Sequence, residues 1–164
     1  MWRFIKNVVF TLVVPGTVGV YVPWMLAAPP SRAASLGWGS WQLVALVPLA
    51  AGGLLYLASI WEFGVRGHGT PAPIDPPRTL VVWGPYRFVR NPMYIAVALV
   101  VLGWACFFQS PSLLWYLAVV VGFFLVVVLG IEEPSLEHAF GADYEAYRSA
   151  VRRWWPGRPF RPTG

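Results

Sequence analysis

The chain has little charge, little histidine and almost no cysteine, and each shortage excludes a class of protein. Only 12% of its 164 residues are charged, against about a quarter in a typical soluble domain, while 57% are hydrophobic. Its one cysteine, Cys106, excludes an intramolecular disulfide and a metal site built from several thiols. The two histidines, His68 and His138, lack paired ligand spacing, so we expect no metal. The composition indicates one lipid-embedded domain, residues 1–164.

Four apolar runs are long enough to cross a membrane as helices. At about 1.5 Å per residue each would be roughly 25 to 34 Å long, and the hydrocarbon core of a bilayer is about 30 Å thick. The sequence therefore predicts an all-α fold, a polytopic membrane bundle of about four transmembrane helices. The expected spans are residues 8–26, 41–63, 92–108 and 113–131.

The positions of the Lys and Arg residues predict the orientation of this bundle. All 12 except Arg32 precede the first run, separate the second from the third, or follow the fourth. Since cytoplasmic segments carry such an excess, we expect both termini, the loop 64–91 and the tail 132–164 in the cytoplasm, with the spans in a bacterial inner membrane. The charges line no basic helix, so nucleic acid is not an expected partner. The first run is too long for the core of a cleaved signal and is expected to remain a span.

The last two runs predict a helical hairpin. Only residues 109–112 separate them, which forces neighbouring antiparallel helices. The polar segment after Glu132 reads as one or two short amphipathic helices over 134–153, interrupted at Gly141.

A possible anion site lies where the third run begins. Asn91 followed by Pro92 is a strong helix start, because Asn caps backbone N–H groups and Pro presets the first helical φ. The positive end of this helix dipole lies beside Arg87 and Arg90, where a carboxylate or phosphate would be stabilised. The alternative is an ordinary cap flanked by arginines that only set topology.

Two adjacent carboxylates, Glu132 and Glu133, close the fourth run at the same cytoplasmic level. The helix dipole and their mutual repulsion disfavour this arrangement, so a cation should offset them. Arg148, Arg152 or solvation could do so. The other possibility is a ligand with an anionic and a cationic end, held between the two helix ends. We interpret Glu62, at the end of the second run, as an interfacial charge rather than a catalytic acid.

Four short motifs succeed one another between about residues 78 and 156. They are Thr79-Leu80-Val81 before Gly84-x-Tyr86, Arg90-Asn91-Pro92-Met93-Tyr94, Glu132-Glu133-x-x-Leu136, and Phe140-Gly141-x-x-Tyr144-x-x-Tyr147. In this order, around a helical hairpin, they resemble the superfamily of isoprenylcysteine carboxyl methyltransferases and phospholipid methyltransferases, which are integral membrane enzymes.

The resemblance implies S-adenosylmethionine as cofactor, reached from the cytoplasm, and a membrane-partitioned methyl acceptor that arrives from the lipid bilayer. A helix N-terminus, carboxylates and aromatic faces complement the charges of this zwitterionic sulfonium compound. No catalytic residue is assigned, because a carboxylate acceptor needs no base and an ammonium has no unambiguous one here. Carried over by position, the expected cofactor-binding residues are Arg78, Thr79, Leu80, Val81, Tyr86, Arg90, Asn91, Pro92, Met93, Tyr94, Glu132 and Glu133.

Three positions depart from the family pattern, and the last of them bears on the acceptor. Asn91 stands where His is common and Ala96 where Gly is common, and Val128 stands where isoprenylcysteine enzymes have an Arg associated with the acceptor. Without that charge a prenylated cysteine is not the expected substrate, and a lipid amine or another apolar acceptor is. Two other functions remain open: a sterol-type membrane reductase that uses NADPH, and a non-enzymatic lipid-binding membrane subunit.

Overall fold

The computed structural model describes residues 11, 13–27, 39–67 and 79–161, and within these ranges it contains helices and no strand. The predicted all-α fold is confirmed for this part of the chain. The expected site residue Arg78 lies outside the described residues, as does the beginning of the first expected span.

The helices are joined into a few longer runs by short π-helical turns. A helix over Val13–Ala27 contains one such turn, Ser40–Gly67 ends in a second, and Pro111–Ala150 contains a third. The second run continues past its predicted end at Phe63. In chain order the elements are η1 (Thr17–Tyr21), α2 (Val22–Ala27), α4 (Ser40–Glu62), η2 (Phe63–Gly67), η3 (Gly84–Arg87), α5 (Pro92–Phe108), α6 (Pro111–Val127), η4 (Val128–Glu132) and α7 (Glu133–Ala150).

Two of these runs are long and apolar enough to cross a membrane, Ser40–Gly67 with 28 residues and Pro111–Ala150 with 40. Only 22% and 17% of their most apolar windows are buried inside the protein, whereas a core helix of a soluble protein would be mostly buried. The exposed apolar side chains indicate association with a membrane. Val13–Ala27 and Pro92–Phe108 are apolar but shorter, and the 17 residues of α5 give about 26 Å of helix. The number of spans and the side of each terminus remain predictions.

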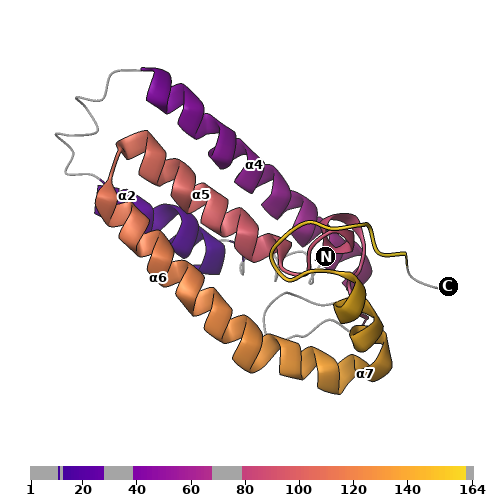
Figure 1. The fold of residues 1–164 in the computed structure, drawn as a ribbon. Coiled ribbons are helices and arrows are strands. Elements are labelled where there is room, and N and C mark those ends of the chain that lie inside the picture. The colour runs from indigo at the N-terminus through magenta and orange to yellow at the C-terminus, as the bar shows by residue number, and fades with distance from the viewer. Residues whose placement is uncertain (1–10, 12, 28–38, 68–78, 162–164) are drawn as a thin grey trace.

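The predicted hairpin is formed by α5 and α6. Helix α5 ends at Phe108, Gln109 takes a left-handed conformation (φ 49°, ψ 45°), and Pro111 opens α6. The two helices leave this turn together and separate toward their other ends, with α4 on the far side of α5 (Figure 1).

Helix α5 packs tightly on α4 because two glycines remove side chains from the contact. A Cβ on Gly52 would lie 2.7 Å from the backbone oxygen of Ala96, and one on Gly103 would lie 2.5 Å from the side chain of Leu49. Small residues are a common means of close approach between membrane helices, where no hydrophobic effect drives association. A Cβ on Gly122 of α6 or on Gly130 of η4 would meet no such neighbour within 4 Å.

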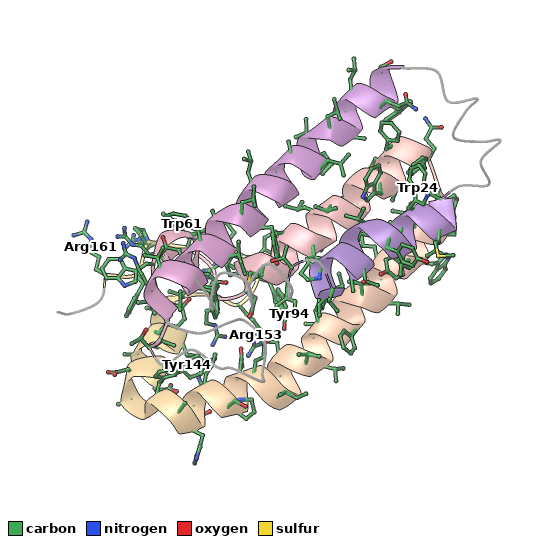
Figure 2. All side chains as sticks on the ribbon, turned by 180° about the vertical axis from the view of Figure 1, so that it is seen from behind. Trp24, Trp61, Tyr94, Tyr144, Arg153 and Arg161 are labelled. Carbon is green, nitrogen blue, oxygen red and sulfur yellow. The ribbon has the colours of Figure 1, made fainter. Side chains whose placement is uncertain are left out.

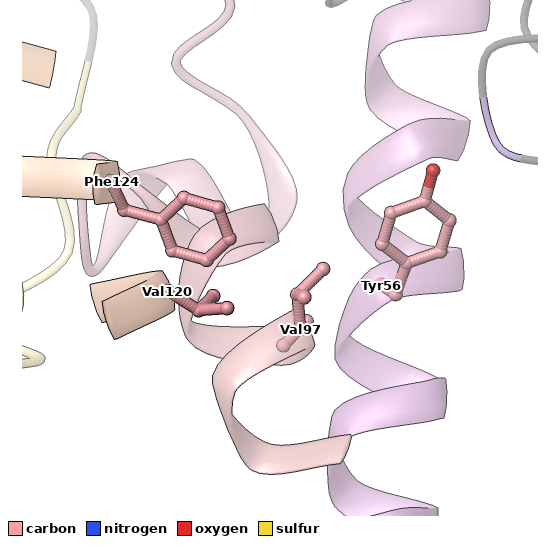
Figure 3. Close-up of a cluster of buried hydrophobic side chains, with 5 residues drawn as sticks. Tyr56, Val97, Val120 and Phe124 are labelled. Atoms are coloured by element: carbon pink, nitrogen blue, oxygen red, sulfur yellow. The ribbon is translucent and has the colours of Figure 1, made fainter. Parts of the chain in front are cut away.

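Apolar side chains form the core in clusters along the bundle. The middle cluster joins α4, α5 and α6 through Tyr56, Val97, Val120 and Phe124 (Figure 3), together with Ala96. Clusters of this kind fix the three helices against one another in the region just inside the polar end.

A further cluster connects α7 to the loop before α5, where Tyr144, Tyr147 and Val151 pack on Val82. Gly141 interrupts α7 with φ 48° and ψ −118°, as the sequence predicted, and this bend returns the C-terminal half of the helix toward the bundle.

Adjacent glycines in α4 allow a matched test of the α4–α5 contact. Gly52→Ala should lower the free energy of unfolding by about 1–3 kcal/mol, because its methyl group overlaps the backbone of Ala96. Gly53→Ala meets nothing within 4 Å and should be neutral or stabilising by up to about 1 kcal/mol, since Ala favours helix over Gly. Thermal unfolding in detergent measures both variants, and equal effects would contradict the packing described.

Candidate functional site

The polar side chains converge where α5 begins and where η4 joins α7. Tyr94, in the first turn of α5, donates a hydrogen bond from its hydroxyl to Oε1 of Glu132. One residue further on, Glu133 pairs with Arg90, whose Nη2 lies 3.2 Å from Oε1. The two helix ends therefore meet at one level. Figure 2 shows Tyr94, Arg153 and Tyr144 at this end of the bundle and Trp24 at the other.

Glu133 is held by two arginines. Arg153 donates from Nε and Nη2 to its two oxygens at 2.7 and 2.9 Å, in addition to the pair with Arg90. The side chains of Arg90 and Glu133 are only 9% and 11% exposed, so this pair is largely shielded from water. Paired hydrogen bonds between an arginine and a carboxylate are among the strongest in proteins. The hydrogen bond to Glu133 also raises the pKa of Arg153 above its ordinary value.

The direct partners of Glu133 are therefore not the arginines expected from the sequence. Arg148 makes its ion pairs with Glu137 and Glu145, at 3.3 and 2.9 Å, on the surface of α7, and it acts on Glu133 only through its charge. Arg152 is exposed and makes no ion pair with a described residue. The sequence analysis missed Arg153 as a partner of Glu133. The two residues are 20 positions apart, and no periodic pattern in the sequence relates them.

Asn91 has a different role from the predicted one. It occupies the cap position of α5 and Pro92 the first helical position, as expected, but its side chain caps no backbone N–H. Its Nδ2 donates instead to the backbone oxygen of Arg153 at 3.2 Å. The prediction of a side-chain cap was therefore wrong, because the amide is used to bind the C-terminal segment. The N–H groups of Met93 and Tyr94 are left without that cap.

Residues 151–161, which we call the C-terminal strap, lie against the turn that precedes α5. Three backbone hydrogen bonds of 2.9–3.0 Å hold them there. The side chain of Arg87 adds a fourth, from Nε to the backbone oxygen of Phe160 at 3.1 Å. The strap therefore belongs to the site. In these bonds the backbone N–H groups of Arg90, Gly157 and Phe160 donate to the backbone oxygens of Arg152, Phe88 and Arg87, respectively.

The loop before α5 contains a buried segment. Only some residues of this loop lie near the cluster of Arg90, Glu132 and Glu133. Val81 and Tyr86 are each 6% exposed, and Tyr147 donates a 2.6 Å hydrogen bond to the backbone oxygen of Tyr86. Burial raises the pKa of Tyr86 well above its ordinary value, and the nearby Tyr147 and Glu132 raise it further. Tyr86 is therefore a neutral phenol. Thr79 lies elsewhere and donates to the backbone oxygen of Arg66 at 2.6 Å.

Glu62 approaches this loop from the end of α4. Its Oε2 lies 3.2 Å from Nε of Arg66, four positions on, and its side chain is 15% exposed. Its role as an interfacial charge stays an interpretation. Gly84 faces it with φ 56°, and a Cβ there would lie 2.8 Å from the carboxylate. A side chain at position 84 would thus be strained and would displace Glu62.

Unsatisfied polar groups at the junction fit a zwitterionic ligand. Nε of Arg90 is buried and has no hydrogen-bond partner among the described residues. The uncapped N–H groups at the start of α5 are donors for an anion, and Glu132 has Tyr94 as its hydrogen-bond partner in the described part of the chain. Glu133 is already paired with Arg90 and Arg153. Glu132 is therefore the carboxylate available to a cationic or hydroxyl group of a ligand.

An apolar cavity of about 280 Å³ lies directly beside this junction, between α5 and α6. Tyr94 forms part of its wall, and Trp154 of the strap lies at the same end. The Tyr94 ring also contacts Phe124, with 4.5 Å between ring centroids. A charged cluster and an apolar groove therefore share one residue, Tyr94.

The fold and this site define a class: a helical membrane protein with a buried acid–arginine cluster next to a groove between helices. Residues 41–143, more than half of the chain, match the model of the phospholipid methyltransferase family. The chain belongs to this family, within the superfamily of isoprenylcysteine carboxyl and phospholipid methyltransferases. Its members are methyltransferases and generally use S-adenosylmethionine.

The chain is also similar to a protein of Haemophilus influenzae described as uncharacterized. The two are 38% identical over 66 residues, which cover 38% of this chain and 98% of that protein. No solved structure matches the chain significantly.

The Glu133–Arg153 contact can be tested with the neighbouring arginine as control. Arg153→Ala should lower the free energy of unfolding by about 1–3 kcal/mol, since it removes two charge-assisted hydrogen bonds. It should also speed proteolysis within residues 151–161, because the strap loses its side-chain anchor. Arg152→Ala removes the same charge from an exposed position and should leave both properties unchanged. Thermal unfolding and limited proteolysis in detergent measure them, and matching results for the two variants would contradict an anchoring role.

Proposed function

We propose that the protein transfers a methyl group from S-adenosylmethionine to an acceptor dissolved in the membrane, at its cytoplasmic face. The observation that supports this most is the junction of Tyr94, which bonds Glu132 on one side and lines the apolar groove on the other. A polar cofactor and an apolar acceptor need such adjoining sites of opposite character.

The polar side of the junction would hold the cofactor. The N–H groups at the start of α5, which the side chain of Asn91 does not cap, suit its carboxylate, and Glu132 suits its ammonium or its ribose hydroxyls. Nε of Arg90 is a further donor inside the same cluster. When bound, the cofactor supplies an electrophilic methyl group on a sulfonium centre.

The apolar side would position the acceptor. Methyl transfer requires the acceptor's lone pair to be aligned with the methyl group and water to be excluded, and it needs little covalent help from the protein. Val128, fully buried, occupies the position where isoprenylcysteine enzymes carry an Arg. An acceptor carboxylate would find no charged partner there, so we favour a lipid amine or another apolar acceptor.

The two other functions weighed from the sequence have weaker support. A sterol-type reductase would use NADPH, and a lipid-binding subunit would need no cofactor. The match of residues 41–143 to the phospholipid methyltransferase family favours neither of these functions. Calorimetry in nanodiscs with S-adenosylhomocysteine and with NADPH separates the three, and binding of the first compound alone is expected.

Two conservative variants test the proposed cofactor site. Tyr94→Phe keeps the ring contact with Phe124 but removes the hydroxyl, and Glu132→Gln removes the charge. Each should weaken binding of S-adenosylhomocysteine about tenfold or more, the cost of one charge-assisted contact. Titration calorimetry on purified, monodisperse protein gives the affinities.

The matched control for this series is Glu137→Gln. Glu137 lies on the same helical run but is exposed, with its side chain 55% accessible and paired with Arg148. Its replacement should leave the affinity unchanged. If Tyr94→Phe and Glu132→Gln bind as tightly as this control, the cofactor site lies elsewhere.

A further inference from the structure

The groove between α5 and α6 has a regular apolar wall on both sides. On α5, Ile95, Leu99 and Leu102 follow one another at the spacing of one helix face, and Leu117 and Val121 face them from α6. The wall presents only apolar surface, although the cavity ends beside the polar cluster at Tyr94.

The groove exists because α5 packs closely against α4 and less closely against α6. Gly52 and Gly103 draw α4 and α5 together, whereas a Cβ added to Gly122 of α6 would meet nothing within 4 Å. Val120 and Phe124 keep α6 attached to the middle cluster. The two helices of the hairpin separate beyond their turn, as both views show (Figures 1 and 2).

We propose that this groove holds the apolar chain of the methyl acceptor and that Trp154 determines which chains fit. The inference rests on the proposed methyl transfer. At about 280 Å³ the groove is near the lower limit of ligand sites, which are roughly 300–1,000 Å³, so it suits part of one chain rather than a whole lipid.

A lipid chain is the occupant that the surroundings supply. The outer faces of α6 beside the groove are apolar and exposed, with Val119 and Val126 each 69% accessible. These faces are where a membrane helix contacts acyl chains. A chain that enters from this side meets no polar group until Tyr94, where its headgroup would adjoin Glu132.

Trp154 lines the groove beside Tyr94 and comes from a part of the chain outside the family match. The match ends at residue 143, whereas Trp154 belongs to the strap, which is tied down by backbone hydrogen bonds on both sides of it. Its ring packs on the middle cluster and lines the groove. The strap thus fixes the indole at the point where chain and headgroup would meet.

Photo-crosslinking tests occupancy without any need for activity. The protein is placed in phosphatidylcholine nanodiscs that contain a phosphatidylethanolamine probe with a diazirine in its acyl chain. After irradiation, mass spectrometry gives the ratio of label at Leu102 and Leu117 to label at the outward-facing Val126. Val121→Trp fills the groove and should lower this ratio about tenfold, because the chain is sterically excluded.

The matched control is Val119→Trp, which adds the same ring to an outward-facing position and should leave the ratio unchanged. Both variants are used only if they are monodisperse. Equal ratios in the two variants would overturn the groove as a chain site.

The two adjacent tryptophans test specificity. Trp154→Ala widens the groove beside Tyr94 and should raise labelling by a probe with a branched acyl chain, relative to a straight one, by about fivefold or more. Trp155 is 73% exposed, and Trp155→Ala should leave this ratio unchanged. An unchanged ratio in Trp154→Ala would overturn its role.

Binding of S-adenosylhomocysteine is measured in the same samples. If the unaltered protein does not discriminate between the straight and the branched probe while it binds S-adenosylhomocysteine, this inference alone is overturned. Absent cofactor binding with discrimination intact overturns the methyl-transfer proposal and leaves the chain site standing.

Discussion

The carboxylate of Glu133 and the arginines that hold it fix the geometry of the whole polar end. Charges this far from water are costly unless they are paired, and here Arg90 comes from the turn before α5, Glu133 from the start of α7 and Arg153 from the strap. Three segments distant in sequence are therefore held at one point. Placement of Tyr94 against Glu132 follows from this, because Glu132 directly precedes Glu133 and Tyr94 lies four positions after Arg90.

This constraint explains how one small bundle can present surfaces of opposite polarity side by side. Close α4–α5 packing through Gly52 and Gly103 leaves α6 free to diverge, and the ion cluster then limits that divergence at the polar end. What remains is an apolar groove that ends at a polar cluster. Membership of the phospholipid methyltransferase family agrees with such an arrangement, since a methyltransferase for lipids must bring a charged cofactor to an apolar acceptor.

Local patterns in the sequence predicted most of the fold, and long-range contacts account for what they missed. The apolar runs predicted the helices, the short segment 109–112 predicted the hairpin, and Gly141 predicted the bend in α7. The pairing of Tyr94 with Glu132 was within reach of prediction, because the hairpin brings the start of α5 and the end of η4 to the same end of the bundle. The contacts of Arg153 and Trp154 were not, because the strap meets the turn before α5 across more than 60 residues. The same contacts explain why the amide of Asn91 caps no backbone group.

The central claim is that the methyl donor lies at the junction between the start of α5 and the end of η4. Ultraviolet crosslinking of radiolabelled S-adenosylmethionine to the protein in nanodiscs, followed by peptide mapping, tests this most directly. The account predicts label within residues 79–94 or 132–154, and competition by unlabelled S-adenosylhomocysteine. Competed label confined to α4, or to the turn between α5 and α6 at the opposite end of the bundle, would contradict it.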